Sequence, residues 1–125
     1  MYSLSMIRSI KELIPKDYIL VDVYKSTPHK ALTLLFINGD SKTVGVRYSV
    51  IRLDILKDCM AIEAFNVPKD ILRNLKNFFD FLGFKDDINI FFYPDTIKAT
   101  DLYRHSKTCS NIRLIGRYIK RVNKT

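Results

Sequence analysis

The sequence predicts an α+β protein, in which an antiparallel sheet packs against two or three helices. Runs dense in β-branched and aromatic residues occupy 18–25 and 31–37 and predict strands. Apolar residues at helical spacing occupy 66–83, with helix signals at both ends. The chain has 125 residues, of which 47% are hydrophobic and 27% charged, as is typical of a globular protein. Residues 1–125 are therefore expected to form one compact α+β domain.

The N-terminal elements are a helix followed by two strands. Residues 7–14 place isoleucines at helical spacing, and Pro15 ends this helix because the residue before a proline is disfavoured in the α region. The strand at 18–25 follows. The next strand, at 31–37, is apolar on both faces and is therefore expected to be central in the sheet.

A hairpin is predicted at Asn38-Gly39-Asp40, because Asn and Gly tolerate the positive φ of hairpin turns. The strand beyond it, at 42–50, alternates apolar and polar residues. A three-residue loop sets Leu34 opposite Val44 and keeps both apolar faces together, whereas a one-residue slip would turn one face to water. The first three strands are thus expected to form an antiparallel meander.

The second half of the chain contains the main core helix and a later strand. Residues 51–66 fit both a strand and a helix pattern. Over 66–83, Asn66 is expected to cap the helix and Gly83 to end it. Residues 88–93 predict the later strand. The side chains expected to pack on the sheet include Phe78, Phe79 and Leu82.

Positive charge is concentrated at the C-terminal end of the chain. Residues 102–125 carry seven Lys and Arg and no acid, whereas residues 1–101 carry 14 basic and 13 acidic residues. A helix is predicted at about 111–122. Its basic face carries Arg113, Arg117, Lys120, Arg121 and Lys124. Its apolar face, which is expected to dock on the core, carries Ile112, Ile115, Ile119 and Val122.

This charge favours an external anion as the partner. Cations near a helix C-terminus are stabilised by the macrodipole, but Arg113 lies in the first turn, and no acid relieves its repulsion with Arg117. We therefore expect a non-enzymatic protein that binds DNA or RNA phosphates. Tyr103 is a candidate for base stacking. The expected phosphate-binding residues are Arg104, Lys107, Arg113, Arg117, Lys120, Arg121 and Lys124.

Other interpretations of the basic segment remain open. It also fits a protein-interaction module, in one version virus-encoded, that engages an acidic partner surface. A solvated face with no partner is a further alternative. A minor alternative is a metal-dependent nuclease, because Asp22, Asp40 and Lys42 loosely follow an acid, acid-x-Lys spacing. The sequence does not separate DNA from RNA, and it predicts no oligomeric state.

The remaining candidate groups indicate neither a cofactor nor a metal. His29 and His105 lie in predicted loops with no nucleophile nearby, so no catalytic residue is assigned. Cys59 and Cys109 are far apart and are expected to be free thiols in a reducing, cytoplasmic compartment. No apolar run approaches the roughly 20 residues of a membrane-spanning helix, so a membrane is not expected as a partner.

Overall fold

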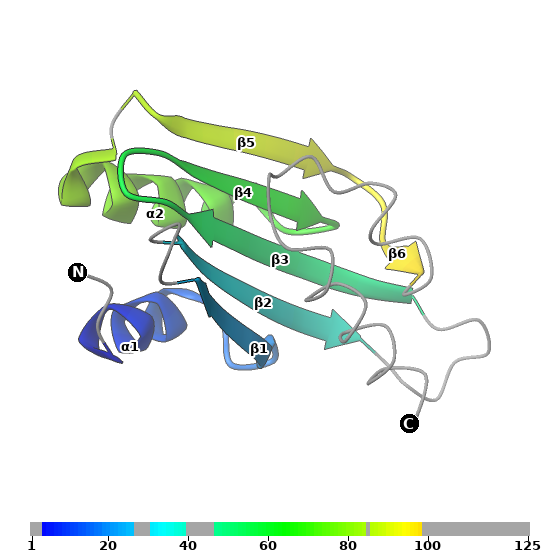
Figure 1. Ribbon diagram of the computed structural model, residues 1–125. Helices are drawn as coiled ribbons and strands as arrows, with labels where there is room; N and C mark the ends of the chain where they lie inside the picture. The colour runs from blue at the N-terminus through cyan, green and yellow to red at the C-terminus, as the bar shows by residue number, and fades with distance from the viewer. Residues whose placement is uncertain (1–3, 27–30, 40–46, 85, 99–125) are drawn as a thin grey trace.

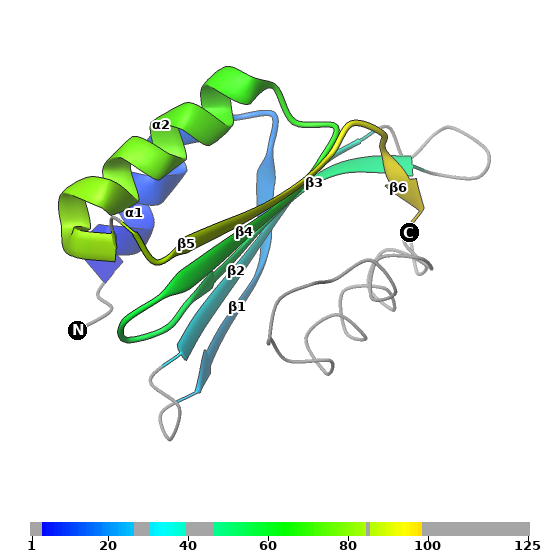
Figure 2. The same ribbon diagram turned by 90° about the horizontal axis from the view of Figure 1, so that it is seen from above.

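The computed structural model describes residues 4–26, 31–39, 47–84 and 86–98, which form a six-stranded sheet with helices on one face (Figures 1 and 2). The fold class is α+β, as the sequence predicts. The predicted C-terminal helix at about 111–122 lies outside the described residues.

The sheet is mixed, with five strands in the order β1-β2-β3-β4-β5 and a short β6 beside β3. Neighbouring strands are antiparallel except β4 and β5, which are parallel. Parallel neighbours need a crossover connection, and the helix α2 provides it here. The expected all-antiparallel sheet is therefore wrong at this pair. The strands are β1 (Ile19–Ser26), β2 (Ala31–Gly39), β3 (Arg47–Ile55), β4 (Met60–Phe65), β5 (Ile88–Tyr93) and β6 (Ile97–Lys98).

The helices α1 (Leu4–Leu13) and α2 (Lys69–Phe79) lie side by side on the same face of the sheet, as Figure 2 shows. A one-turn π-helix, η1 (Asp80–Phe84), continues α2. Each helix turns an apolar stripe toward the sheet. The fully buried residues of this core include Ile10, Leu34, Phe36, Ile51, Leu53, Ile62, Leu75 and Phe79.

The opposite face of the sheet carries a second apolar cluster, and we call this face the second face. Its buried members are Leu35, Tyr48, Val50, Phe65 and Ile97. β3 contributes to both faces, and every residue of the strand after Arg47 is buried. The strand at 31–37, expected to be central, is β2, which has a neighbour on each side. β3 lies in the middle of the strand order.

The register of the second hairpin differs from the prediction. Asn38 and Gly39 belong to β2 instead of a three-residue loop, and Leu34 lies opposite Leu53. The third strand, β3, runs to Ile55 and overlaps the predicted strand at 47–50, whereas residues 40–46 lie outside the description. The observed pairing places the apolar residues of 51–55 on the helix-covered face. The alternation in 42–50, on which the prediction depended, reaches only the start of this strand.

Residues 51–66, which fitted two patterns, form the end of β3 and all of β4. The connection is a tight turn in which the Leu56 N–H donates to the Cys59 carbonyl at 2.9 Å. Antiparallel pairing therefore runs through the four successive strands β1 to β4, one strand more than the expected meander of three.

α2 agrees with its prediction in position but not at every residue. Gly83 has φ 105° and ends the helical segment, as expected for a residue without Cβ. Asn66 does not cap the helix: it has φ 55°, lies before Pro68, and donates its side-chain amide to Ser49. Leu82 is wrong as a core residue, since it is 44% exposed. The backbone kinks at the non-helical Gly83 within η1, and Phe84 is buried in its place.

Candidate functional site

The residues predicted to bind phosphate and to stack on bases lie outside the described part of the chain. This applies to Tyr103, Arg104, Lys107, Arg113, Arg117, Lys120, Arg121 and Lys124. Of the groups of the nuclease alternative, Asp22 lies in β1, while Asp40 and Lys42 fall outside the described residues. His29, His105 and Cys109 also fall outside them, whereas Cys59 is half-buried in the turn between β3 and β4.

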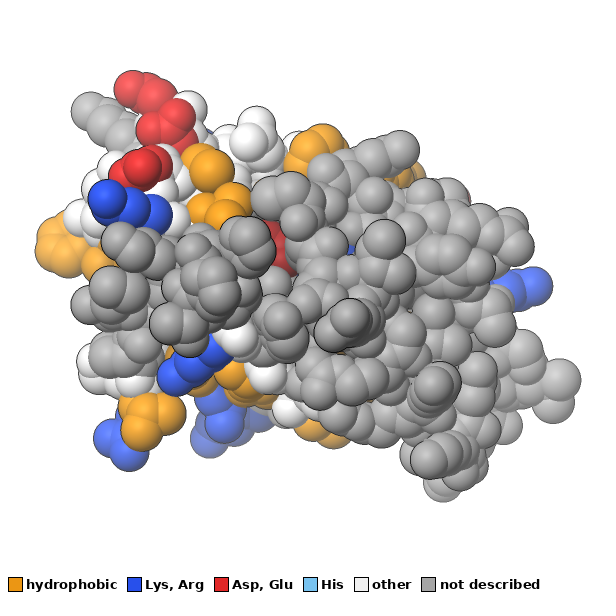
Figure 3. Space-filling model, in the orientation of Figure 1, with side chains coloured by type: hydrophobic (Ala, Val, Ile, Leu, Met, Phe, Trp, Pro, Cys, Tyr) orange, Lys and Arg blue, Asp and Glu red, His pale blue; other side chains and the backbone are white. Residues whose placement is uncertain are grey.

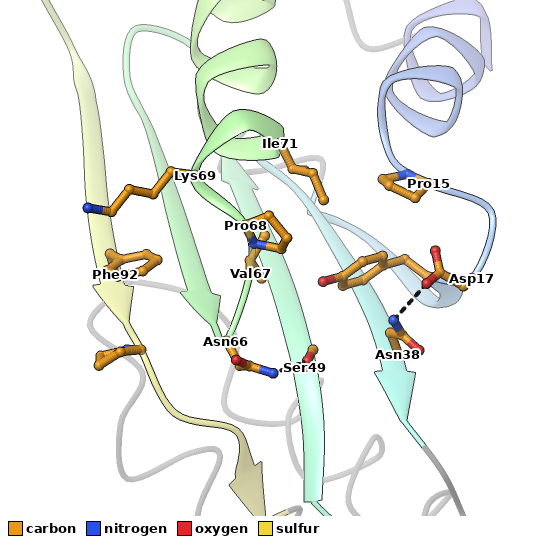
Figure 4. A pocket seen from close by; sticks show the side chains of 12 residues that line it. Pro15, Asp17, Asn38, Ser49, Asn66, Val67, Pro68, Lys69, Ile71 and Phe92 are labelled. Carbon is orange, nitrogen blue, oxygen red and sulfur yellow. Dashed lines mark hydrogen bonds between the residues drawn. The ribbon is translucent and has the colours of Figure 1, made fainter.

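A cleft of about 560 Å³ opens at one end of the helix-covered face (Figure 4). It lies between the N-terminus of α2 and the segment that joins α1 to β1. Its position follows from the topology, because the carboxyl ends of β2, β4 and β5 and the amino ends of β1 and β3 meet there. The lining residues include Asp17, Tyr18, Asn38, Ser49, Asn66 and Lys69.

The polar side chains of this cleft form one network across the strand ends. The Asn38 amide donates to the Asp17 carboxylate at 3.0 Å, and the Asn66 amide donates to the Ser49 hydroxyl at 2.9 Å. Tyr18 lies beside both pairs, and its interactions with the side chains of Ser49 and Asn38 lower its pKa. The network thus ties the entry to β1, the end of β2, the start of β3 and the end of β4.

The Tyr18 hydroxyl is kept protonated in this network. Burial raises its pKa above the usual 10.0, and the Asp17 carboxylate raises it further, while hydrogen bonds with Ser49 and Asn38 oppose the change. A neutral phenol donates hydrogen bonds but is a poor general base. Among the described residues no group of His, Cys, Asp and Glu is arranged to hold a metal ion. The cleft therefore offers hydrogen bonds, with the Lys69 ammonium and the Phe92 ring beside them (Figure 4).

A buried ion cluster occupies the centre of the second face. Arg52 Nε lies 3.3 Å from Asp54 Oδ2, and Arg52 Nη1 lies 3.9 Å from Glu63 Oε1. The Thr33 hydroxyl donates to Asp54 Oδ1 at 2.6 Å. The pairing of the strands explains the arrangement, because Glu63 lies opposite Arg52 and Thr33 opposite Asp54. Arg52 and Asp54 share a face since they are two apart on one strand.

Sequence reasoning missed this cluster. Within 51–55 the apolar residues alternate with Arg52 and Asp54, which is the pattern of a strand with one solvated face. The available signal was the pair of opposite charges, Arg52 and Asp54, two residues apart on one strand. Together with Glu63 on the next strand, it indicates an ion cluster on one face of the sheet. Because buried charges are stable only when paired and hydrogen-bonded, the cluster is explained by its structural role.

A shallow groove of about 240 Å³ lies where β6 meets the start of β3. Arg47 and Lys98 are exposed there and lie directly opposite each other in the β3–β6 ladder. Arg47 Nε donates to Thr96 Oγ1 at 2.8 Å, and its Nη2 donates to the Thr96 carbonyl. The rings of Phe65 and Tyr93 stack at 4.7 Å beside this pair. Asp95 also lines the groove.

This groove lies immediately before the basic C-terminal segment in the chain. β6 ends at Lys98, and the acid-free segment begins at residue 102. Ile97 is buried in the second-face cluster, so the chain is anchored to the sheet at this point. The exposed cations Arg47 and Lys98 therefore lie at the point where the described chain leads into the basic segment, residues 102–125.

Comparison with known proteins gives no relative: no family model, no curated protein and no solved structure matches this chain. No described helix is long and apolar enough to cross a membrane. Function must therefore be inferred from the residues themselves.

Proposed function

We propose that this protein binds DNA or RNA, without catalysing a reaction on it, by contacting phosphates through its basic C-terminal segment. The observation that carries the proposal is the segregation of charge: residues 102–125 hold seven cations and no acid in a chain of net charge +8. A concentrated cationic segment releases counterions from a polyanion on binding, and this release drives sequence-independent affinity.

The described structure supports the proposal at the entry to this segment. Arg47 and Lys98 extend the positive charge onto the end of the sheet, and the Arg47 guanidinium is oriented by Thr96. The Phe65–Tyr93 stack lines the same groove, but Phe65 is buried in the second-face cluster, so the support comes from the exposed charge of Arg47 and Lys98. Asp95 opposes binding there, so we expect the C-terminal cations to dominate.

The test is a salt titration of binding to duplex and single-stranded nucleic acid of arbitrary sequence. Five phosphate contacts from Arg113, Arg117, Lys120, Arg121 and Lys124 give a log–log slope of about −4.5 on duplex DNA and about −3.5 on single strands. Micromolar or tighter affinity is expected at about 100 mM salt. The affinity should vary little with sequence, since phosphate contacts carry no base information.

The deciding variant is Arg117→Glu with Arg121→Glu, which should weaken binding by about tenfold or more and leave the melting temperature nearly unchanged. Its matched control is Lys16→Glu with Lys57→Glu, which changes the net charge equally at two exposed turn positions. A complete failure to bind at about 50 mM salt would favour an acidic protein partner instead. Equal binding by the two double variants would show that the C-terminal segment is not the site.

A further inference from the structure

Among the described strands, β5 forms an edge of the sheet that lacks the usual protection against pairing. It lies at one end of the strand order, with β4 as its partner among the described strands. Its residues, Ile88–Tyr93, include no charge and no proline, and its register with β4 has no bulge. β1, at the other end of the order, carries Lys25 and a register shift between Leu20 and Asp22. Charges and bulges are the common means by which proteins block edge pairing, and β5 has neither.

The backbone groups that face this open edge can be assigned. The Met60 N–H donates to the Asp87 carbonyl at 2.9 Å, and the Asn66 N–H donates to the Tyr93 carbonyl at 2.8 Å. Odd-numbered residues of β5 thus face β4. Since backbone groups alternate in direction along a strand, the N–H and C=O groups of Ile88, Ile90 and Phe92 point to the open edge.

The same residues carry exposed apolar side chains. Ile90 and Phe92 are each 39% exposed, and Ile88 is half-buried. All three lie on the helix-covered face, because Ile90 is opposite Ile62 and Phe92 is opposite Ala64 in the core layer. An added strand would therefore satisfy backbone hydrogen bonds and cover apolar side chains together.

We propose that β5 pairs with β5 of a second copy of this chain, antiparallel about a two-fold axis at Ile90. In this register Ile90 faces its own copy and Ile88 faces Phe92, so each outward backbone group finds a complement. The two-fold axis is perpendicular to the sheet, so the helices of both copies lie on one face of a continuous sheet. Pro94, the next outward position, has no N–H and ends the ladder.

Charge at the two ends of β5 favours a second copy over an unrelated peptide. Asp86 and Asp87 are exposed at the start of the strand, where acidic side chains gather in Figure 3. Lys69 extends over Phe92 near the end of the strand (Figure 4). Antiparallel pairing brings the acidic end of one copy toward the end of β5 that carries Lys69 in the other. The strand is thus complementary to itself in backbone, apolar contact and charge.

The test is the mass of the full chain in solution, measured by analytical ultracentrifugation without nucleic acid from micromolar concentrations upward. We expect a dimer that Ile90→Lys and Ile90→Pro each weaken by about tenfold or more, through a buried charge and through a lost outward donor in both copies. Neither change breaks a bond to β4, so melting should remain cooperative in both variants. Phe81→Lys is the control, because Phe81 is 87% exposed and lies outside β5.

A cysteine cross-link tests the register. In a Cys59→Ser, Cys109→Ser background, Ile90→Cys should be joined into a covalent dimer by a short bifunctional thiol reagent, since the Cβ atoms of a directly opposed hydrogen-bonded pair lie about 5.5 Å apart. Leu82→Cys should not cross-link. A chain that is monomeric at every concentration overturns the proposal, and so does a dimer that persists in both Ile90 variants. Arg117→Glu with Arg121→Glu should leave the dimer intact while weakening nucleic-acid binding. Loss of the dimer proposal and loss of the binding proposal can therefore be told apart.

Discussion

Arg52 is fully buried in the middle of a sheet, where an arginine is rarely found. Its guanidinium lies between the carboxylates of Asp54 and Glu63, and Asp54 also accepts the Thr33 hydroxyl bond. Desolvating three charges costs free energy, which their mutual attraction offsets only while the partners remain together. The cluster therefore selects one register between β3 and its neighbours, because a slip would separate the charges.

Removing the cation should expose this dependence. We expect Arg52→Met to lower the free energy of unfolding by about 3–5 kcal/mol, because two carboxylates lose their buried counter-charge. Urea unfolding at neutral pH measures the loss. Arg47→Met is the matched control: Arg47 is exposed on the same strand, and losing its bonds to Thr96 should cost at most about 1 kcal/mol. Similar losses in the two variants would contradict a stabilising role for the ion cluster.

α2 shows how one element can meet its sequence pattern and then depart from it. Ile71, Leu72, Leu75 and Phe79 follow helical spacing and are all buried. After Phe79 the side chains of Phe81 and Leu82 face solvent, and the kink at Gly83 returns Phe84 to the core. The positive φ of Gly83 makes this ending possible, since a Cβ there would strain the backbone.

Two phenylalanines of this segment form a matched test of the packing. Phe79 is fully buried, with its ring centroid 5.2 Å from that of Phe78 and 6.0 Å from that of Phe84. Phe79→Ala should cost about 3–5 kcal/mol of unfolding free energy, because it removes a large side chain and leaves a cavity. Phe81→Ala should change stability by no more than about 0.5 kcal/mol. Chemical denaturation measures the unfolding free energy of both variants. A loss of several kcal/mol in Phe81→Ala would contradict the exposed position of Phe81.

Three tyrosines with raised pKa values surround the same end of the molecule. Burial is the main cause for Tyr18, Tyr48 and Tyr93, and the nearby carboxylate of Glu63 adds to the effect at Tyr93. Tyr18 lies on the helix-covered face and the other two on the second face. Both faces of the sheet therefore hold neutral phenols near the proposed entry to the basic segment.

This arrangement predicts a loss of stability at alkaline pH. The folded protein keeps these three protons to a higher pH than the unfolded chain, in which the tyrosines titrate near 10.0. Above that pH the unfolded chain binds fewer protons, so the unfolding free energy falls until the folded pKa values are passed. Urea unfolding over a pH series measures the decline. Ultraviolet absorbance of tyrosinate provides the check, and ionisation of all seven tyrosines at their ordinary pKa in the folded protein would contradict it.

The sequence by itself determined the fold class, α1, β1, the position of α2 and the residues of β5. These elements have apolar patterns of one clear period and stop signals such as Pro15 and Gly83, which act locally in the chain. It also predicts the candidate site, residues 102–125, because net charge needs no coordinates. The binding of nucleic acid and the expected single domain remain predictions.

Only the tertiary structure decided the strand register, the parallel pairing of β4 with β5 and the burial of the charged cluster. Asn38-Gly39 has the composition of a hairpin turn, yet pairing with β3 keeps both residues in β2. Arg52 has the sequence environment of a solvated position, and its partner Glu63 lies on another strand. Pairing and burial are set by segments far apart in the chain, so local propensity cannot fix them. The same limit applies to the β5 edge, which is visible only once the strand order is known.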